Sequence, residues 1–137
     1  MRVMALSPGV AEGAPLRLDE PLSFWGGLDV KTGRIVDRWH PQAGQCVAGR
    51  VLMMPSGRGS SSGSAALAEA LRLGVGPAAI LLLRRDGIVI VGALVAAELY
   101  GLSCPVALAR AEDWSVIAAA ERLRLNATEA GAELALT

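Results

Sequence analysis

The order of short apolar runs and helix-patterned segments constrains the fold of this 137-residue chain more than any other feature. The runs Arg50–Met54, Ala78–Leu83 and Pro105–Leu108 are apolar almost throughout, which is typical of strands buried on both faces. Between them, Ser64–Leu73 has the apolar spacing of a helix, and Ala93–Leu99 is predicted to be a second helix. Strand–helix–strand units of this kind predict parallel strands with helices packed against the sheet.

The first third of the chain contains shorter strand candidates. Arg2–Leu6 and Leu16–Leu18 are weak candidates, and Leu22–Trp25 is a stronger one that ends at two glycines. Asp29–Gly33 is typical of a turn, and Arg34–Asp37 is predicted to follow it as a strand. We therefore expect this part of the chain to consist of strands and loops.

The last part of the chain predicts a short helix followed by a hairpin. Asp113–Ala120 has acidic residues in its first turn, where they favour a helix. Apolar residues then alternate with polar ones on both sides of a polar turn at Asn126–Gly131, which predicts two antiparallel strands. The length fits one domain, so we expect residues 1–137 to form a single mixed α/β domain with parallel and antiparallel pairing.

The composition excludes some function classes and favours a protein partner. Hydrophobic residues make up 53% of the chain and charged residues 19%, which predicts apolar surface that a partner covers; an apolar monomer is the alternative. Basic and acidic residues are equal in number, at 13 each, and aromatic residues make up only 4%. Neither a phosphate-neutralising patch nor a base-stacking platform is expected, so nucleic acid is not the expected partner.

Metal binding and membrane insertion are not expected of this chain either. The cysteines Cys46 and Cys104 lie far apart, and His40 is the single histidine, so the sequence supplies no ligand set for a metal. The most apolar stretch, Ala78–Tyr100, is interrupted by two arginines and an aspartate, and the N-terminus has no long apolar segment typical of a signal peptide. We expect a cytoplasmic protein.

One segment has the composition of a ligand-binding loop. Residues Ser56–Ser64, here called the serine loop, read SGRGSSSGS and lie between a predicted strand and a predicted helix. Unpaired amides and the helix dipole favour anions at a helix N-terminus, and Arg58 supplies a guanidinium that matches a carboxylate or phosphate. The alternatives are a serine-rich surface turn or a flexible linker.

Two known motifs fit the serine loop poorly. A phosphate-binding P-loop requires a lysine, and the loop contains none. Gly59–Gly63 matches the pattern of a hydrolase nucleophile, with Ser61 at its centre, but His40 precedes the serine instead of following it. A stand-alone module that binds phosphate or carboxylate, and a serine hydrolase, remain the alternatives from other functional classes.

Several blocks together resemble the small domain of the aconitase X family. The blocks are Ser23–Asp29, Thr32–Asp37, His40-Pro41, Gly57–Ser64 and Gly92–Leu99. The resemblance implies a swivelling β/β/α domain with a partly open β-barrel and flanking helices. It also implies the small subunit of a dehydratase that removes water from a small hydroxy acid, cis-3-hydroxy-L-proline first and mevalonate 5-phosphate as the alternative. A large catalytic subunit, holding iron or an iron–sulfur cluster, is the implied partner.

The resemblance also assigns roles within the serine loop. It implies that Ser60 is the base that removes a proton from carbon, and that Ser61 and Ser62 bind the substrate carboxylate, with Gly59 and Gly63 allowing close approach of the backbone. Ordinary aconitases have an arginine where this chain has Ser62, and Arg58 is the candidate replacement.

Residues of the other matched blocks are less clearly assigned. We expect His40 either near the site or subunit interface, or bonded to backbone. Asp29 and Asp37 are expected in turns. Trp25 and Trp39 are expected in the core or at an interface.

Overall fold

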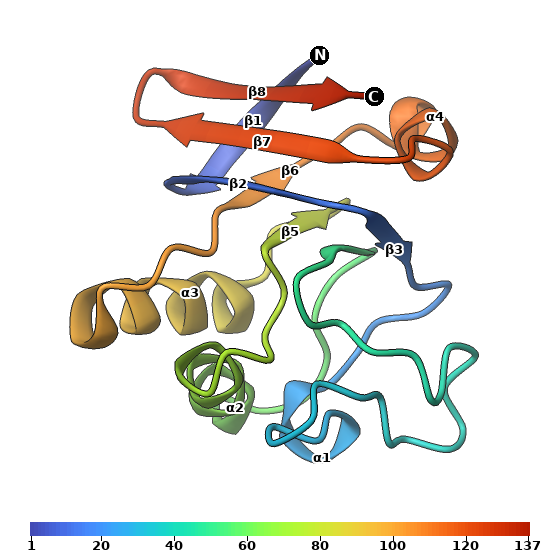
Figure 1. Ribbon diagram of the computed structural model, residues 1–137, viewed down its shortest axis with the longest axis vertical. Coiled ribbons are helices and arrows are strands. Elements are labelled where there is room, and N and C mark those ends of the chain that lie inside the picture. Colours follow the sequence, from blue (N-terminus) through green and yellow to red (C-terminus); the bar gives the residue numbers. More distant parts are fainter.

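Eight strands form one curved sheet in the computed structural model, which describes residues 1–137 (Figure 1). The strands are β1 (Arg2–Ser7), β2 (Gly9–Gly13), β3 (Pro15–Arg17), β4 (Val51–Met54), β5 (Ala79–Leu82), β6 (Val106–Leu108), β7 (Leu123–Thr128) and β8 (Gly131–Leu136). Their order across the sheet is β2-β7-β8-β1-β6-β5-β4-β3. The mixed α/β class predicted from the sequence is confirmed.

Strands β3, β4, β5 and β6 are parallel neighbours. All residues of β4 and β5 are buried, which confirms the prediction of strands covered on both faces. The helices α2 (Ser62–Arg72) and α3 (Gly87–Tyr100) connect these strands and pack on the same side of the sheet (Figure 1). The two predicted strand–helix–strand units are therefore present.

The remaining strands are antiparallel. β1 lies between β6 and β8 and is antiparallel to both, and the predicted hairpin is formed by β7 and β8. The sequence did not predict β2, which follows Pro8 and begins and ends with glycine, yet it pairs with β7 along its whole length. A short helix, α4 (Trp114–Ala118), follows the 3-10 turn η1 (Ala111–Asp113) and confirms the helix predicted in this region.

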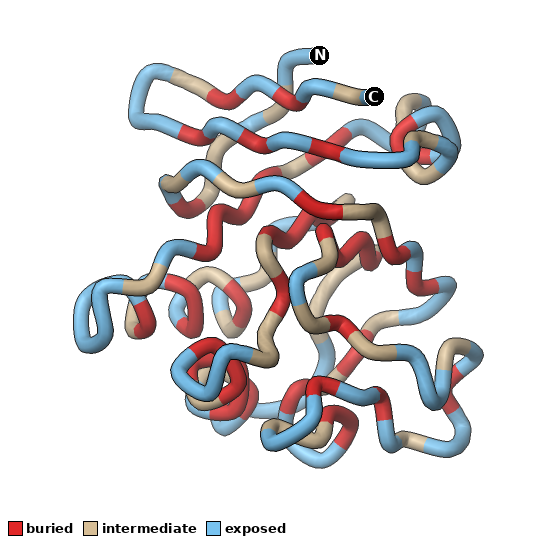
Figure 2. The backbone as a smooth tube through the Cα atoms, viewed as in Figure 1, coloured by how far each residue is buried: buried red, intermediate tan, exposed pale blue.

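The sheet curls into a partly open barrel. Strands β2 and β3 lie at opposite ends of the strand order, yet only Ala14 separates them in the chain, so the two ends of the sheet must approach each other. Side chains alternate across β4: Leu52 and Met54 pack toward the helices, whereas Val51 and Met53 pack into the barrel. Figure 2 shows the buried residues gathered along the central strands of the sheet.

Two predictions about the elements were wrong. Leu22–Trp25 is not a strand: Phe24–Gly27 forms the single kinked turn α1, in which Gly26 has a φ of +82°. Arg34–Asp37 contributes only isolated bridges. Helix α3 also begins six residues before the predicted start at Ala93, because Asp86 caps it at Gly87.

None of the helices has the length and apolarity needed to cross a membrane.

Candidate functional site

The serine loop lies at the carboxyl edge of the parallel strands. It leaves the end of β4 and leads directly into α2, and the turns that follow β5 and β6 reach the same edge. Ligands of open α/β sheets bind at this edge, because loops and helix N-termini converge there. The fold therefore places the predicted loop where a small ligand can reach it.

The loop folds into the first turn of α2. The amides of Gly63 and Ser64 donate to the carbonyls of Ser60 and Ser61, at 2.9 and 3.1 Å. The amides of Ser60 and Ser61 donate to no protein group, and the Ser61 side chain at the N-cap makes no capping hydrogen bond. Ser60, Ser61 and Ser62 are exposed. Two unpaired amides and three accessible hydroxyls thus surround the positive end of the helix dipole, which suits an anionic ligand.

Close packing against neighbouring segments fixes the loop. Gly59 has a φ of +104°, and a Cβ at this position would lie 2.7 Å from the Ser23 hydroxyl. A Cβ on Gly57 would lie 3.0 Å from a carboxylate oxygen of Asp86. Gly57 also forms an isolated parallel β-bridge with Leu22. These glycines are required because the backbone of the loop touches Ser23 on one side and Asp86 on the other.

Arg58 is directed toward Asp37. Its guanidinium lies 3.6 Å from the carboxylate of Asp37, and both side chains are partly exposed. Such pairs contribute little to stability in water. The other carboxylate oxygen of Asp37 accepts a hydrogen bond from the amide of Trp39 at 3.0 Å, as expected for a turn aspartate.

Helix α3 is joined to the start of α2. The Ser64 hydroxyl donates to the carbonyl of Ile88 at 2.6 Å. The Asp86 carboxylate accepts from the amides of Ile88 and Val89, at 2.9 and 3.2 Å, and so caps α3. Sequence reasoning missed Ser23 and Asp86, although an aspartate directly before a glycine and an apolar run is a recognisable N-cap signal.

His40 does not belong to the serine loop. The side chain is 4% exposed, its Nε2 atom lies 3.1 Å from the carbonyl of Glu20, and its Nδ1 atom accepts the amide of Gln42 at 3.0 Å. This is the backbone-bonding alternative predicted from the sequence. With both ring nitrogens engaged, His40 offers Ser61 no base, so the hydrolase pattern at Gly59–Gly63 lacks its partner.

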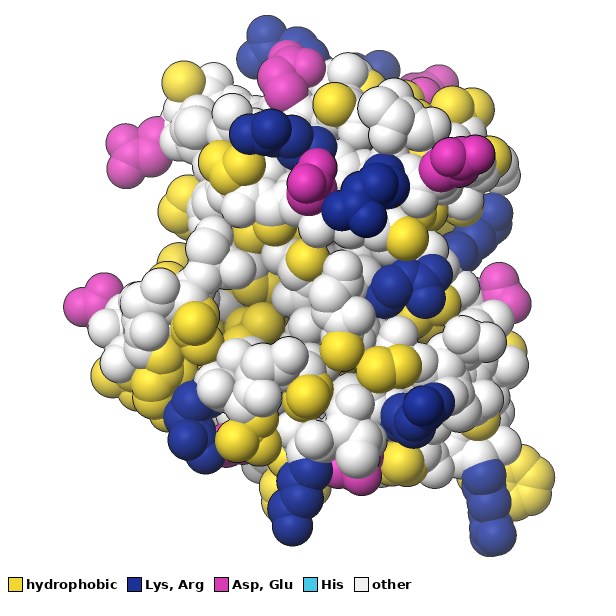
Figure 3. Space-filling model, in the orientation of Figure 1, with side chains coloured by type: hydrophobic (Ala, Val, Ile, Leu, Met, Phe, Trp, Pro, Cys, Tyr) yellow, Lys and Arg dark blue, Asp and Glu magenta, His cyan; other side chains and the backbone are white.

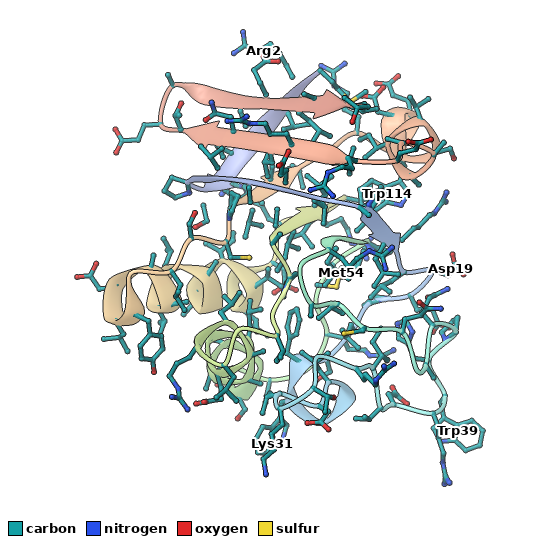
Figure 4. All side chains as sticks on the ribbon, in the orientation of Figure 1. Arg2, Asp19, Lys31, Trp39, Met54 and Trp114 are labelled. Carbon is teal, nitrogen blue, oxygen red and sulfur yellow. The ribbon has the colours of Figure 1, made fainter.

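The two tryptophans of the matched blocks are exposed. Trp25 is 66% exposed and Trp39 is 83% exposed, so neither is a core residue. Figure 4 shows Trp39 projecting from a corner of the molecule. Asp29 accepts the amide of Lys31 at 2.9 Å and has the predicted turn role.

Two hollows of the surface lie outside the serine loop. The larger, of about 670 Å³, lies between β1, Leu108–Arg110 and the β7–β8 turn at Thr128–Gly131. An apolar hollow of about 570 Å³ lies between α1 and α2, with Ala65 and Trp25 among its lining residues. The serine loop lines neither of these two hollows, and Ser60, Ser61 and Ser62 are exposed, so a second surface would be needed to enclose a ligand against them.

The donor set of this chain does not fit a metal centre. No three side chains of the His, Cys, Asp and Glu types gather in one place. Cys104 is buried, and burial raises the pKa of its thiol to about 12, so the thiolate that a metal requires is disfavoured. Cys46 donates a weak hydrogen bond to the carbonyl of Thr32.

The comparisons with known proteins identify the family. The family model described as "Aconitase X swivel domain" matches residues 1–134. A solved structure of Thermococcus kodakaraensis aconitase X, in its holo form, superposes with a TM-score of 0.80 at 26% identity and covers 98% of this chain and 96% of that one. The curved mixed sheet with its helices is thus the fold of an aconitase X swivel domain. The chain belongs to the aconitase X swivel-domain family.

Relatives of two kinds are similar to this chain. A cis-3-hydroxy-L-proline dehydratase of Pseudomonas aeruginosa is 47% identical over 102 residues, which cover 74% of this chain and 18% of that protein. A phosphomevalonate dehydratase small subunit of Thermococcus gammatolerans is 33% identical over 126 residues, which cover 92% of this chain and 90% of that one. The chain therefore spans about a fifth of the length of the longer relatives and nearly all of the small subunit.

Proposed function

We propose that this chain is the small, swivelling subunit of an aconitase X-type dehydratase and that Ser60 is its catalytic base. The observation that carries the proposal is the serine loop itself, which presents exposed hydroxyls and two unpaired amides at the start of α2. The membership of residues 1–134 in the swivel-domain family supports it. A serine hydroxyl becomes a useful base only when its alkoxide is stabilised, and amides at a helix N-terminus provide that stabilisation.

The substrate class follows from the donors around Ser60. The hydroxyls of Ser61 and Ser62 and the amides beyond Gly59 offer hydrogen bonds to a carboxylate, whereas the Gly63 amide is already bonded to the carbonyl of Ser60. In 3-hydroxyproline the hydroxyl lies on the carbon next to the one that bears the carboxylate. Removal of the proton from the carboxylate-bearing carbon leaves an electron pair that forms a double bond as the hydroxyl departs, so that one water molecule is lost in total. Ser60 receives the proton. Arg58, once it has left Asp37, binds the negative charge of the substrate.

The partner is proposed from surface chemistry. The serine loop is exposed, and electrostatic stabilisation of an alkoxide is weak in water. Apolar side chains also gather on the outer face of α3, where Val91, Leu94 and Leu99 are exposed (Figure 3). A large subunit that covers part of this surface and closes over the loop would exclude water. The iron or iron–sulfur centre is expected in that subunit, since this chain supplies no ligand set.

Cis-3-hydroxy-L-proline is the first candidate substrate, because this chain is 47% identical to part of a dehydratase that is named for this substrate. Phosphomevalonate is the second candidate, because a small subunit named for that activity matches this chain over 92% of its length. Either substrate is a small molecule that carries a carboxylate and a hydroxyl.

The decisive experiment uses the assembled complex. The tagged chain is purified anaerobically from its own host, together with the host protein that is similar to the remaining four-fifths of the longer dehydratases. Dehydration of both candidate substrates by this complex is then assayed. Ser60→Ala is expected to lower the dehydration rate about 10²- to 10⁴-fold, because it removes the proton acceptor, while the complex still assembles. Ser115→Ala, an exposed serine of α4, is the control and is expected to keep full activity.

Three results would count against the proposal. Near-normal turnover by Ser60→Ala would remove this serine from the mechanism. Purification of the chain alone, with phosphate or carboxylate binding in the absence of any partner, would instead favour a stand-alone anion-binding module. Labelling of Ser61 by a fluorophosphonate would favour the hydrolase alternative.

A further inference from the structure

Arg84 lies beside the residue that opens the serine loop. The amide of Arg84 donates to the carbonyl of Pro55 at 3.0 Å, which continues the pairing of β5 with β4 beyond the ends of both strands. Ser56 is the next residue after Pro55. The fold therefore places an arginine that follows β5 at the base of a loop that leaves β4.

The side chain of Arg84 reaches the first residue of this loop. Its Nη2 atom donates to the hydroxyl of Ser56 at 3.3 Å, and that hydroxyl in turn donates to the carbonyl of Gly57 at 3.0 Å. Ser56 thus links the guanidinium group to Gly57, the first glycine of the loop. A guanidinium has five N–H donors, and this contact uses one of them.

The charge of Arg84 is not compensated by any acid of the chain. No carboxylate lies within ion-pair distance of it, whereas Arg58 faces Asp37 at 3.6 Å. The nearest acid in the sequence, Asp86, uses its Oδ1 atom to accept the amides of Ile88 and Val89 in the first turn of α3. Arg58 belongs to the serine loop and Arg84 lies at its base. Of these two arginines, Arg84 can bind an anion without first breaking an ion pair.

We propose that Arg84 binds the carboxylate of the substrate, an inference that rests on the proposed dehydratase function. In this arrangement Arg84 holds the anionic end of the substrate from the β5 side, while the hydroxyls and amides at the start of α2 hold it from the other. An arginine–carboxylate contact is charge-assisted, and its two parallel N–H groups fix orientation as well as affinity. Arg84 thus supplies a guanidinium at the base of a loop in which Ser62 stands where ordinary aconitases have an arginine.

The test compares three variants of the assembled complex with the wild type, on whichever of cis-3-hydroxy-L-proline and phosphomevalonate the wild type dehydrates. Arg84→Gln is expected to raise KM about 10- to 100-fold and to leave kcat within about threefold, because a binding contact is lost and the base remains. Arg84→Lys keeps the charge but not the planar group, so part of the loss in KM is expected to be recovered. Arg124→Gln, an exposed arginine of β7 without an ion pair, is the control and should change neither constant.

The outcomes separate this inference from the function on which it rests. An unchanged KM in Arg84→Gln, or a fall in kcat at constant KM, would overturn the role of Arg84 while the dehydratase function stands. A wild-type complex that dehydrates neither substrate would refute the proposed function, and the role of Arg84 with it. Since Arg84 is exposed, the melting temperature of the variant chain should stay close to that of the wild type, which excludes loss of folding as the cause.

Discussion

The contact between α2 and α3 at Gly92 gives the sharpest prediction about stability. A Cβ on Gly92 would lie 2.9 Å from Cδ2 of Leu67, 3.1 Å from its Cβ and 3.0 Å from the carbonyl oxygen of Ser64. The end of the leucine side chain can rotate away, but the Cβ and the carbonyl belong to the body of α2. Gly92→Ala must therefore push the two helices apart by several tenths of an ångström.

Two opposing terms decide the magnitude of this effect. Alanine in place of glycine within a helix gains about 1 kcal/mol from helix propensity. Overpacking of a tight contact costs about 1–3 kcal/mol. We expect Gly92→Ala to lower the free energy of unfolding by about 1 kcal/mol, which corresponds to a fall of about 4 °C in melting temperature.

The matched control lies on the same helix. A Cβ on Gly87, the first residue of α3, meets no atom within 4 Å, so Gly87→Ala should leave stability unchanged or raise it slightly. Both variants are measured by thermal and urea unfolding of the isolated chain. A Gly92→Ala variant as stable as Gly87→Ala would show that the helices are not held at this spacing, and the contact at Ser64 would then not restrain the serine loop.

Two further predictions concern the cap of α3 and the buried thiol. Asp86→Ala should lower the free energy of unfolding by about 1 kcal/mol, because two amides lose their acceptor, whereas Asp86→Asn should retain most of it in the same thermal assay. The pKa of Cys104 is raised by burial to about 12 from an ordinary value of 9.0. Between these two pH values the Cys104 thiol has lost its proton in the unfolded chain but keeps it in the folded chain. The free energy of unfolding is therefore unaffected by this thiol below pH 9 and falls as the pH rises above that value. Urea unfolding between pH 8 and 10.5 should show a steeper decline for the wild type than for Cys104→Ala, and parallel declines would contradict the assignment.

Strands buried on both faces were predictable because their sequences leave few alternatives. Val51–Met54 and Ala79–Leu82 have no polar position, so neither can lie at a surface, and the helix between them follows from its spacing. The same reasoning failed at Leu22–Trp25. Leu22 and Phe24 are buried as a strand pattern requires, but Gly26 turns the backbone and leaves Trp25 exposed. Local alternation cannot report a turn that depends on a glycine with positive φ.

The candidate site was predictable in part. The serine loop was recognised because its glycines and serines lie together in the sequence and precede a helix. Ser23, Arg84 and Asp86 were missed because they reach the loop through strand pairing and helix packing. The sequence also left His40 open between two roles, and only the positions of the Glu20 carbonyl and the Gln42 amide show its backbone contacts.

The position of β1 in the middle of the sheet has a kinetic consequence. The amino group of Met1 donates to the carbonyl of Leu134, and the amide of Leu134 donates back to Met1, so residues 133 positions apart are paired. In chain order β1 precedes both of its neighbours, β6 and β8, so its pairing with β8 must wait until Gly131–Leu136 has been synthesised. Pairing over such separations closes large loops and slows folding toward the millisecond-to-second range. During synthesis, the helical side of the molecule with the serine loop can form before the barrel does, so one edge of β1 stays open for longest.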